Sequence, residues 1–272
     1  MDKKKPIGIC GLCKREKMLQ KSHMLPKSVY SMIGRASLGE NSRQIGFLNA
    51  QNNFCKLRHQ VTKYYLCDDC EAIFDKRGEN IVVKELYSGI SCGGKFILRD
   101  KLDSIKGVFS EDRSCEWFFQ DNFGSIDVRA YIHFILGVLW RASSTDWNNR
   151  SFPRCYKNAL GQKYEEQVRN YLITQDNCFL DKIQITVFVD TSCQPVSWVE
   201  MPYYNKNDGK NVHVFALPGV DVFTTVGGKK FYNDVSPMAR GDQHLIFAKL
   251  DLQTGKRFNN IISRFQNSTW SS

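Results

Sequence analysis

The sequence predicts an α+β protein in which an N-terminal zinc-binding module is followed by a helical segment and an antiparallel, β-rich C-terminal domain. Two C-x-x-C pairs lie within the first 70 residues, and a strong helical pattern lies near the middle of the chain. From residue 183 onward, apolar and polar residues alternate as they do in half-buried strands. We expect two domains, formed by residues 1–110 and 111–272.

The two C-x-x-C pairs are Cys10 with Cys13 and Cys67 with Cys70. Four thiolates in two such pairs can form a tetrahedral zinc site, and Gly11 permits a tight turn around the first pair. The pairs are 53 residues apart, whereas compact zinc fingers place about 15 to 20 residues between them. We expect one shared structural zinc ion, and two unrelated cysteine turns are the alternative.

The N-terminal module is expected to contain short elements around these cysteines. Residues 22–26 should be extended, because the residue before a proline disfavours helical geometry. Residues 28–33 suit a brief helix, and the polar segment 34–53 suits a loop. Residues 61–66 are β-branched and aromatic and should form a strand, and residues 71–86 follow with a helical pattern.

The rest of the chain predicts helices and then strands. Residues 89–109 should connect the two halves, and Ser125 should be the N-cap of a long core helix. Residues 162–173 predict a second helix. Alternating segments separated by glycine-containing turns predict antiparallel strands at Ile183–Val189, Val196–Val199, Val212–Leu217, Val220–Val226 and Leu245–Leu250.

The net charge of +10 is concentrated near the N-terminus. Residues 1–110 contain 20 Lys and Arg against 11 Asp and Glu, a net charge of +9, which leaves +1 for the remainder. A basic zinc module is typical of a protein that binds the phosphate backbone of nucleic acids, although a solvated lysine-rich surface gives the same count. The candidate nucleic-acid contacts are Lys14, Arg15, Lys17, Lys21, Lys27, Lys76 and Arg77.

The sequence contains no apolar run long enough to span a bilayer, and its charged N-terminus is not followed by a signal-peptide core. We therefore expect a cytoplasmic protein without a membrane partner. In a reducing compartment, the six cysteines outside the two pairs should be free thiols.

His23 is the candidate general base, because the unperturbed pKa of histidine lies near neutrality and the residue sits in a short segment that ends at Pro26. A histidine that only bonds the backbone or ligates zinc is the alternative. Glu71 and Asp75 lie four residues apart on one helical face, where their oxygens would suit Mg²⁺ or Mn²⁺. Acidic residues that complement the helix dipole would give the same pattern. Glu79, two turns after Glu71, is expected not to reach this ion.

The segments Cys10-x-x-Cys13, Ser22-His23-x-x-Pro26 and Leu66-Cys67-x-x-Cys70-Glu71 resemble the HNH endonuclease superfamily in its four-cysteine zinc form, over roughly residues 8–87. The resemblance implies a treble-clef, ββα-metal fold. It also implies His23 as the base, and Glu71 and Asp75 as the residues that face the catalytic metal.

Two positions depart from the family pattern. Ser22 stands where the family usually has an acidic metal ligand, and Glu71 and Asp75 stand where Asn or His, and His or Lys, are common. By the same resemblance, Asn52 or Asn53 is a candidate for the asparagine that braces the histidine loop. His59 lies close to the same region and is an alternative base.

Two functions follow from these residues. The first is a metal-dependent endonuclease that hydrolyses phosphodiester bonds, of DNA rather than RNA, in a defence or mobile-element system. The second is a non-catalytic zinc module that binds nucleic acid or a protein. In either case the C-terminal domain is expected to dock a protein partner or a second copy of the chain.

Overall fold

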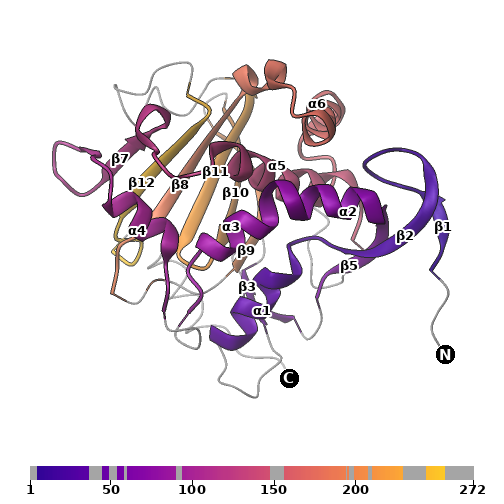
Figure 1. Ribbon diagram of the computed structural model, residues 1–272, viewed down its shortest axis with the longest axis horizontal. Helices are drawn as coiled ribbons and strands as arrows, with labels where there is room; N and C mark the ends of the chain where they lie inside the picture. The colour runs from indigo at the N-terminus through magenta and orange to yellow at the C-terminus, as the bar shows by residue number, and fades with distance from the viewer. Residues whose placement is uncertain are drawn as a thin grey trace.

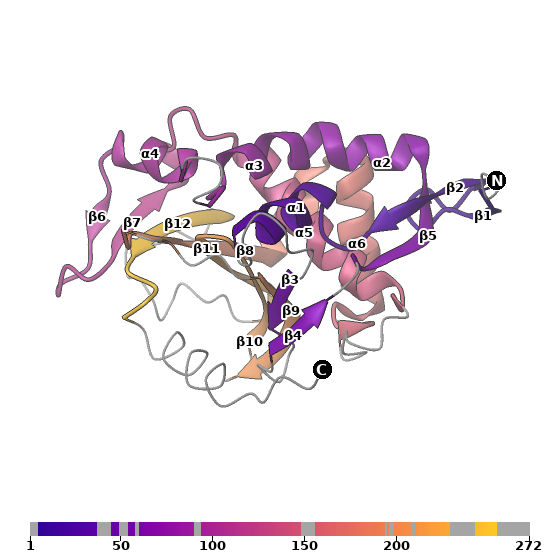
Figure 2. The same ribbon diagram turned by 90° about the horizontal axis from the view of Figure 1, so that it is seen from below.

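The computed structural model describes residues 5–36, 45–48, 54–57, 60–89, 94–147, 156–193, 195, 199–207, 210–228 and 243–254. Within these residues the chain forms two sheets and a group of helices, which confirms the predicted α+β class. The helices gather on one side of the larger sheet, and the smaller sheet projects from the body (Figures 1 and 2).

The smaller sheet and the elements next to it are formed by the N-terminal part of the chain. Strands β1 (Ile7–Ile9), β2 (Glu16–His23) and β5 (Thr62–Cys67) pair antiparallel in the order β1-β2-β5. Helix α1 (Lys27–Ala36) follows β2, and helix α2 (Asp68–Phe74) begins directly after β5. The end of β2 and the start of α2 are therefore held together by one hydrogen-bonded sheet.

The predicted helix over residues 71–86 is present, but it contains one wide turn. Helix α2 continues through the π-helical turn η1 (Asp75–Glu79) into α3 (Asn80–Glu85). Gly78 lies in the wide turn, where an added Cβ would come within 2.9 Å of the Phe134 backbone nitrogen on helix α5. The missing side chain thus allows two helices to approach closely at this point.

Helix α5 (Val128–Ser144) is the central helix of the molecule (Figure 1). The side chain of Asp127 accepts a hydrogen bond from the Ala130 amide, so Asp127 is the N-cap and the prediction of Ser125 was wrong. Tyr131 packs edge-on against Phe247 of the larger sheet, with ring centroids 5.1 Å apart. Helix α5 thereby joins the larger sheet to the helix that follows the cysteines.

The larger sheet has the strand order β4-β3-β9-β10-β11-β8-β12-β7-β6. Its antiparallel run β9-β10-β11-β8 agrees with the predicted hairpins, whereas β3 with β9 and β8 with β12 pair parallel. The strands are β3 (Ile45–Leu48), β4 (Phe54–Leu57), β6 (Val108–Phe109), β7 (Glu116–Phe119), β8 (Ile183–Asp190), β9 (Val199–Asn207), β10 (Lys210–Leu217), β11 (Val220–Gly228) and β12 (Leu245–Leu250). Further helices are α4 (Ile97–Asp103), η3 (Gln120–Asn122), α6 (Gly161–Thr174) and η5 (Asn177–Lys182).

Two segments differ from the sequence prediction. The expected loop at 34–53 contains the end of α1 and strand β3, and the expected connection at 89–109 contains α4 and β6. Phe47 of β3 lies opposite Cys55 of the neighbouring strand β4 on one side and opposite Val199 of β9, about 150 residues away, on the other. Residues 196–198 of the strand predicted at 196–199 lie outside the described part of the chain, and the strand observed next to them, β9, runs from Val199 to Asn207 instead.

The hydrophobic core is shared by residues on both sides of position 110. One cluster contains Leu66 and Phe74 from the N-terminal part and Trp140 and Val187 from the C-terminal part. The division into domains at residue 110 stays a prediction about folding units, and the structure shows close packing across it. Among the described helices, none has both the length and the apolar character needed to cross a membrane.

Candidate metal centre and adjoining pocket

The structure brings the four predicted cysteines together. One sulfur atom from each of Cys10, Cys13, Cys67 and Cys70 lies within 4.8 Å of all the others, and the Cys13–Cys67 distance is 4.0 Å. Tetrahedral zinc with bonds of about 2.3 Å to sulfur requires sulfur atoms about 3.8 Å apart. The cluster is therefore positioned to hold a metal ion, and its geometry is compatible with structural zinc.

The turn that carries the first cysteine pair depends on a glycine. The Gly11 amide donates a hydrogen bond to the Tyr65 carbonyl of β5, and an added Cβ would lie 2.2 Å from the Tyr65 ring. Lys14 has a φ of 60°, and its amide donates to the Cys10 carbonyl to close the turn. These contacts fix the first pair against the strand that leads to the second pair.

The surroundings of Cys10 favour its thiolate, the form that binds metals. A hydrogen bond from the Cys70 thiol, together with hydrogen bonds from the amides of Cys67 and Cys13, lowers the pKa of Cys10 to about 4, although burial opposes this shift. Arg169 of α6 donates a hydrogen bond of 2.6 Å to the Leu12 carbonyl, which ties the cysteine turn to the C-terminal part of the chain. Hydrogen bonds from α6 on one side and to β5 on the other therefore hold the metal-binding turn in place.

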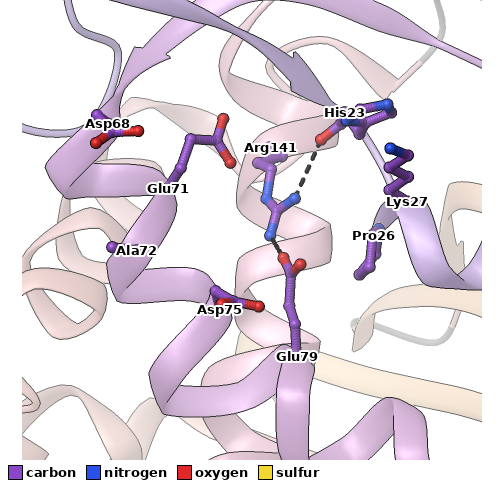
Figure 3. Close-up of a pocket in the computed structure, with 9 residues that line it drawn as sticks. All are labelled: His23, Pro26, Lys27, Asp68, Glu71, Ala72, Asp75, Glu79 and Arg141. Atoms are coloured by element: carbon purple, nitrogen blue, oxygen red, sulfur yellow. Dashed lines mark hydrogen bonds and ion pairs between the residues drawn. The ribbon is translucent and has the colours of Figure 1, made fainter.

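A pocket of about 360 Å³ lies beside this centre, between the end of β2 and the helix that follows the cysteines (Figure 3). It is lined by His23, Pro26, Lys27, Asp68, Glu71, Ala72, Asp75, Glu79 and Arg141. The three predicted catalytic residues, His23, Glu71 and Asp75, therefore line a single pocket.

His23 is held in one tautomer by Gln60. The Nε2 atom of His23 lies 2.7 Å from Oε1 of Gln60. Because a carboxamide oxygen only accepts, Nε2 carries the proton and the basic lone pair is on Nδ1. Burial lowers the pKa of His23, while the Gln60 hydrogen bond and the Glu71 charge oppose the shift. The side chain is thus neutral near pH 7 and able to accept a proton.

The carboxylates of the pocket differ in their surroundings. Asp75 is exposed, whereas Oε1 of Glu71 is buried and has no hydrogen-bond partner among the described residues. The Glu71 carboxylate points toward the pocket (Figure 3). A buried, unsatisfied carboxylate oxygen is costly unless something binds it, and oxygen atoms are the ligands that Mg²⁺ and Mn²⁺ prefer. Glu71 and Asp75 thus both line the pocket, but among the described residues the four cysteines are the group of three or more possible metal ligands that lies within 4.8 Å.

Arg141 is a member of the pocket that sequence reasoning missed. Its Nη1 donates a hydrogen bond of 3.1 Å to the His23 carbonyl, and its Nη2 is ion-paired with Glu79 (Figure 3). The guanidinium also lies over the Phe74 ring, 4.2 Å from its centroid. Glu79 was expected not to reach the ion. It does line the pocket, but its carboxylate is ion-paired with Arg141. A charged residue inside the apolar pattern of α5 was the available signal.

Ser22 does not face the pocket as a ligand. Its side chain is buried, and Oγ accepts a hydrogen bond of 3.0 Å from the Leu66 amide across the β2–β5 pair. The residue that replaces the family's acidic ligand therefore supports the small sheet. Asn52, Asn53 and His59 lie outside the described residues.

The candidate nucleic-acid contacts have different environments. Lys17 forms an ion pair with Asp69, and Arg77 donates hydrogen bonds to the carbonyls of Leu172 and Ile173 at the end of α6. The exposed cations are Lys14, Arg15, Lys21, Lys27 and Lys76. Lys27 is the one of these that lines the pocket.

Comparison of the chain with protein-family models, with curated proteins and with solved structures found no match. Function is therefore inferred from the geometry of the cysteine cluster and the pocket.

Proposed function

We propose that this protein is a metal-dependent endonuclease of the HNH type, with a structural zinc ion at the four cysteines. The observation that carries the proposal is that His23, Glu71 and Asp75 line one pocket, on the small sheet and the helix that also carry cysteines of the cluster. The sheet and helix that hold the metal centre also carry these three side chains, as in the superfamily that the sequence resembles.

Each residue has a separate role in this proposal. His23, with its lone pair on Nδ1, removes a proton from the water that attacks the phosphodiester. Glu71 and Asp75 would hold Mg²⁺ or Mn²⁺, which supplies Lewis-acid stabilisation of phosphate charge when bound. The Gln60 hydrogen bond stabilises the imidazolium that His23 becomes during the reaction.

Nucleic acid is the proposed substrate, with DNA favoured. The excess of +9 within residues 1–110 and the exposed lysines near the pocket would attract a phosphate backbone. Lys27 lies beside His23 in the pocket lining, where its ammonium group can pair with a phosphate (Figure 3).

The test is cleavage of supercoiled plasmid and of single-stranded DNA and RNA with Mg²⁺ or Mn²⁺. General-base removal typically costs about 10² to 10⁴ in rate, so His23→Ala should cleave at least a hundredfold more slowly, with zinc content and DNA affinity unchanged. Glu71→Ala and Asp75→Ala should be rescued in part by raising the Mn²⁺ concentration.

Two outcomes would redirect the proposal. If His23→Ala cleaves as fast as the wild type, His59 becomes the next candidate for the base. If the wild type cleaves no nucleic acid with either ion, the protein acts as a binding module for nucleic acid or a protein.

A further inference from the structure

Arg141 is a buried cation that contacts both sides of the pocket. Its side chain is 2% exposed, and it comes from α5, outside residues 8–87, which carry the family resemblance. One end of the guanidinium bonds the backbone at His23, and the other pairs with Glu79, one helical turn after Asp75. A single side chain thus links the strand of the candidate base to the helix of the candidate metal ligands.

The backbone around Arg141 is itself fixed. The Trp147 Nε1 atom donates a hydrogen bond of 2.8 Å to the Arg141 carbonyl. The Tyr65 hydroxyl of β5 donates a hydrogen bond of 2.7 Å to Ser144 Oγ, and Lys63 donates one of 2.8 Å to Thr145 Oγ1. The C-terminal end of α5 is therefore tied to the small sheet, and the guanidinium is held from a rigid element.

The two Nη atoms of Arg141 have partners on opposite sides of the pocket, whereas its buried Nε has no hydrogen-bond partner among the described residues. Glu79 alone would balance the charge, yet the second end of the guanidinium is bonded to the His23 carbonyl. A planar guanidinium holds two partners in a fixed relative orientation, which a point charge cannot do. The guanidinium of Arg141 therefore bridges the end of β2 and the helical turn that carries Glu79.

We propose that Arg141 is the positioning residue of this pocket, holding the His23 backbone in register with the helix that bears Glu71 and Asp75. The inference rests on the proposed function. It adds that the site is completed by α5, so that the N-terminal segment alone does not position its base. Small displacements of a catalytic group lower kcat, because reacting groups must be aligned closely.

The test compares Arg141→Met combined with Glu79→Gln against the full-length wild type. This pair removes both charges of the ion pair with little change in volume and leaves no unpaired carboxylate at position 79. Arg99→Met is a matched control, because Arg99 also lies over a ring, Phe96, and donates a hydrogen bond to a backbone carbonyl, that of Ser192, at a site outside the pocket. Zinc content and thermal unfolding establish that each variant is folded.

Two readouts separate positioning from general stability. Hydrogen exchange of the Met24 amide, which bonds the Val61 carbonyl next to His23, should quicken at least tenfold in the double variant. With plasmid DNA, kcat should fall at least tenfold at unchanged KM. Arg99→Met should change neither quantity. If the double variant does not fold, Arg141→Lys, which keeps a cation beside Glu79, is measured in the same way and should still show rapid exchange.

Unchanged exchange at Met24, or an unchanged kcat in a folded variant, would overturn the role of Arg141. If the wild type cleaves nothing, the proposed function fails, while the exchange measurement still decides whether Arg141 holds the strand.

Discussion

The metal centre permits the most direct test, replacement of Cys67 by serine. Cys67 is 2% exposed and lies at the end of β5, where its amide also bonds the Cys10 sulfur at 3.3 Å. Structural zinc contributes about 10 to 16 kcal/mol in zinc-finger peptides, so an even share for one of four ligands is about 3 kcal/mol. At about 2 to 4 °C for each kcal/mol, Tm should fall by about 6 to 12 °C.

The assay combines metal analysis with thermal unfolding, with and without a chelator. The wild type should contain about one zinc ion per chain, and Cys67→Ser should bind zinc more weakly and lose it at a lower chelator concentration. Cys178→Ser is the matched control, because this thiol is exposed and lies outside the cluster, and it should leave both zinc content and Tm close to wild type.

The number of transitions adds a test of the predicted boundary at residue 110. The core shared by Leu66, Phe74, Trp140 and Val187 predicts that removing the metal shifts one cooperative transition. Two separate transitions would show that residues 1–110 unfold on their own. A wild type that is folded without zinc, and whose Tm a chelator does not change, would refute the argument for a structural metal.

Two further predictions concern hydrogen bonding and pH. Gln60→Leu removes the acceptor that fixes the His23 side chain. Loss of about 1.5 kcal/mol of hydrogen-bond stabilisation in the transition state should slow plasmid cleavage about tenfold. An unchanged cleavage rate would show that this hydrogen bond does not contribute to catalysis. Burial, with the nearby charge of Asp190, raises the pKa of Asp221 to about 7 from 3.8. A folded-state pKa above the unfolded value adds to the free energy of unfolding at low pH. This contribution is lost as the pH rises from about 4 to about 7. In urea unfolding between pH 4 and pH 8, the free energy of unfolding of Asp221→Asn should therefore fall less than that of the wild type. The difference should be at most about 4 kcal/mol. The same pH dependence of the free energy of unfolding in both proteins would contradict this.

Local patterns were sufficient for several parts of the structure. Cysteine spacing identified the four thiols, and the four-residue spacing of Glu71 and Asp75 placed both on one helical face. Alternating residues and a glycine-containing turn predicted strand β8 and the β10–β11 hairpin. Each of these patterns spans a few residues or recurs with a fixed period, so it can be recognised in a single sequence.

Other parts depended on residues far apart in the chain. Strand β3 is short and polar at its flanks, and beyond its local partner β4 it joins the larger sheet through β9, about 150 residues away. The parallel pairing of β8 and β12 likewise has no local marker. No local pattern connects Arg141 with the candidate base, and the fold brings it to the His23 carbonyl, 118 residues away.

The sequence by itself determined the ligand chemistry of this protein: four thiols for a metal, a histidine, and carboxylates at helical spacing. Covalent identity and short-range periodicity carry that information. The folded molecule alone shows which groups share a pocket. It also shows that Glu79 is ion-paired with Arg141 and that Ser22 bonds the neighbouring strand of the small sheet. The physical reason is that burial and long-range packing, which select the partners of each polar group, are properties of the whole fold.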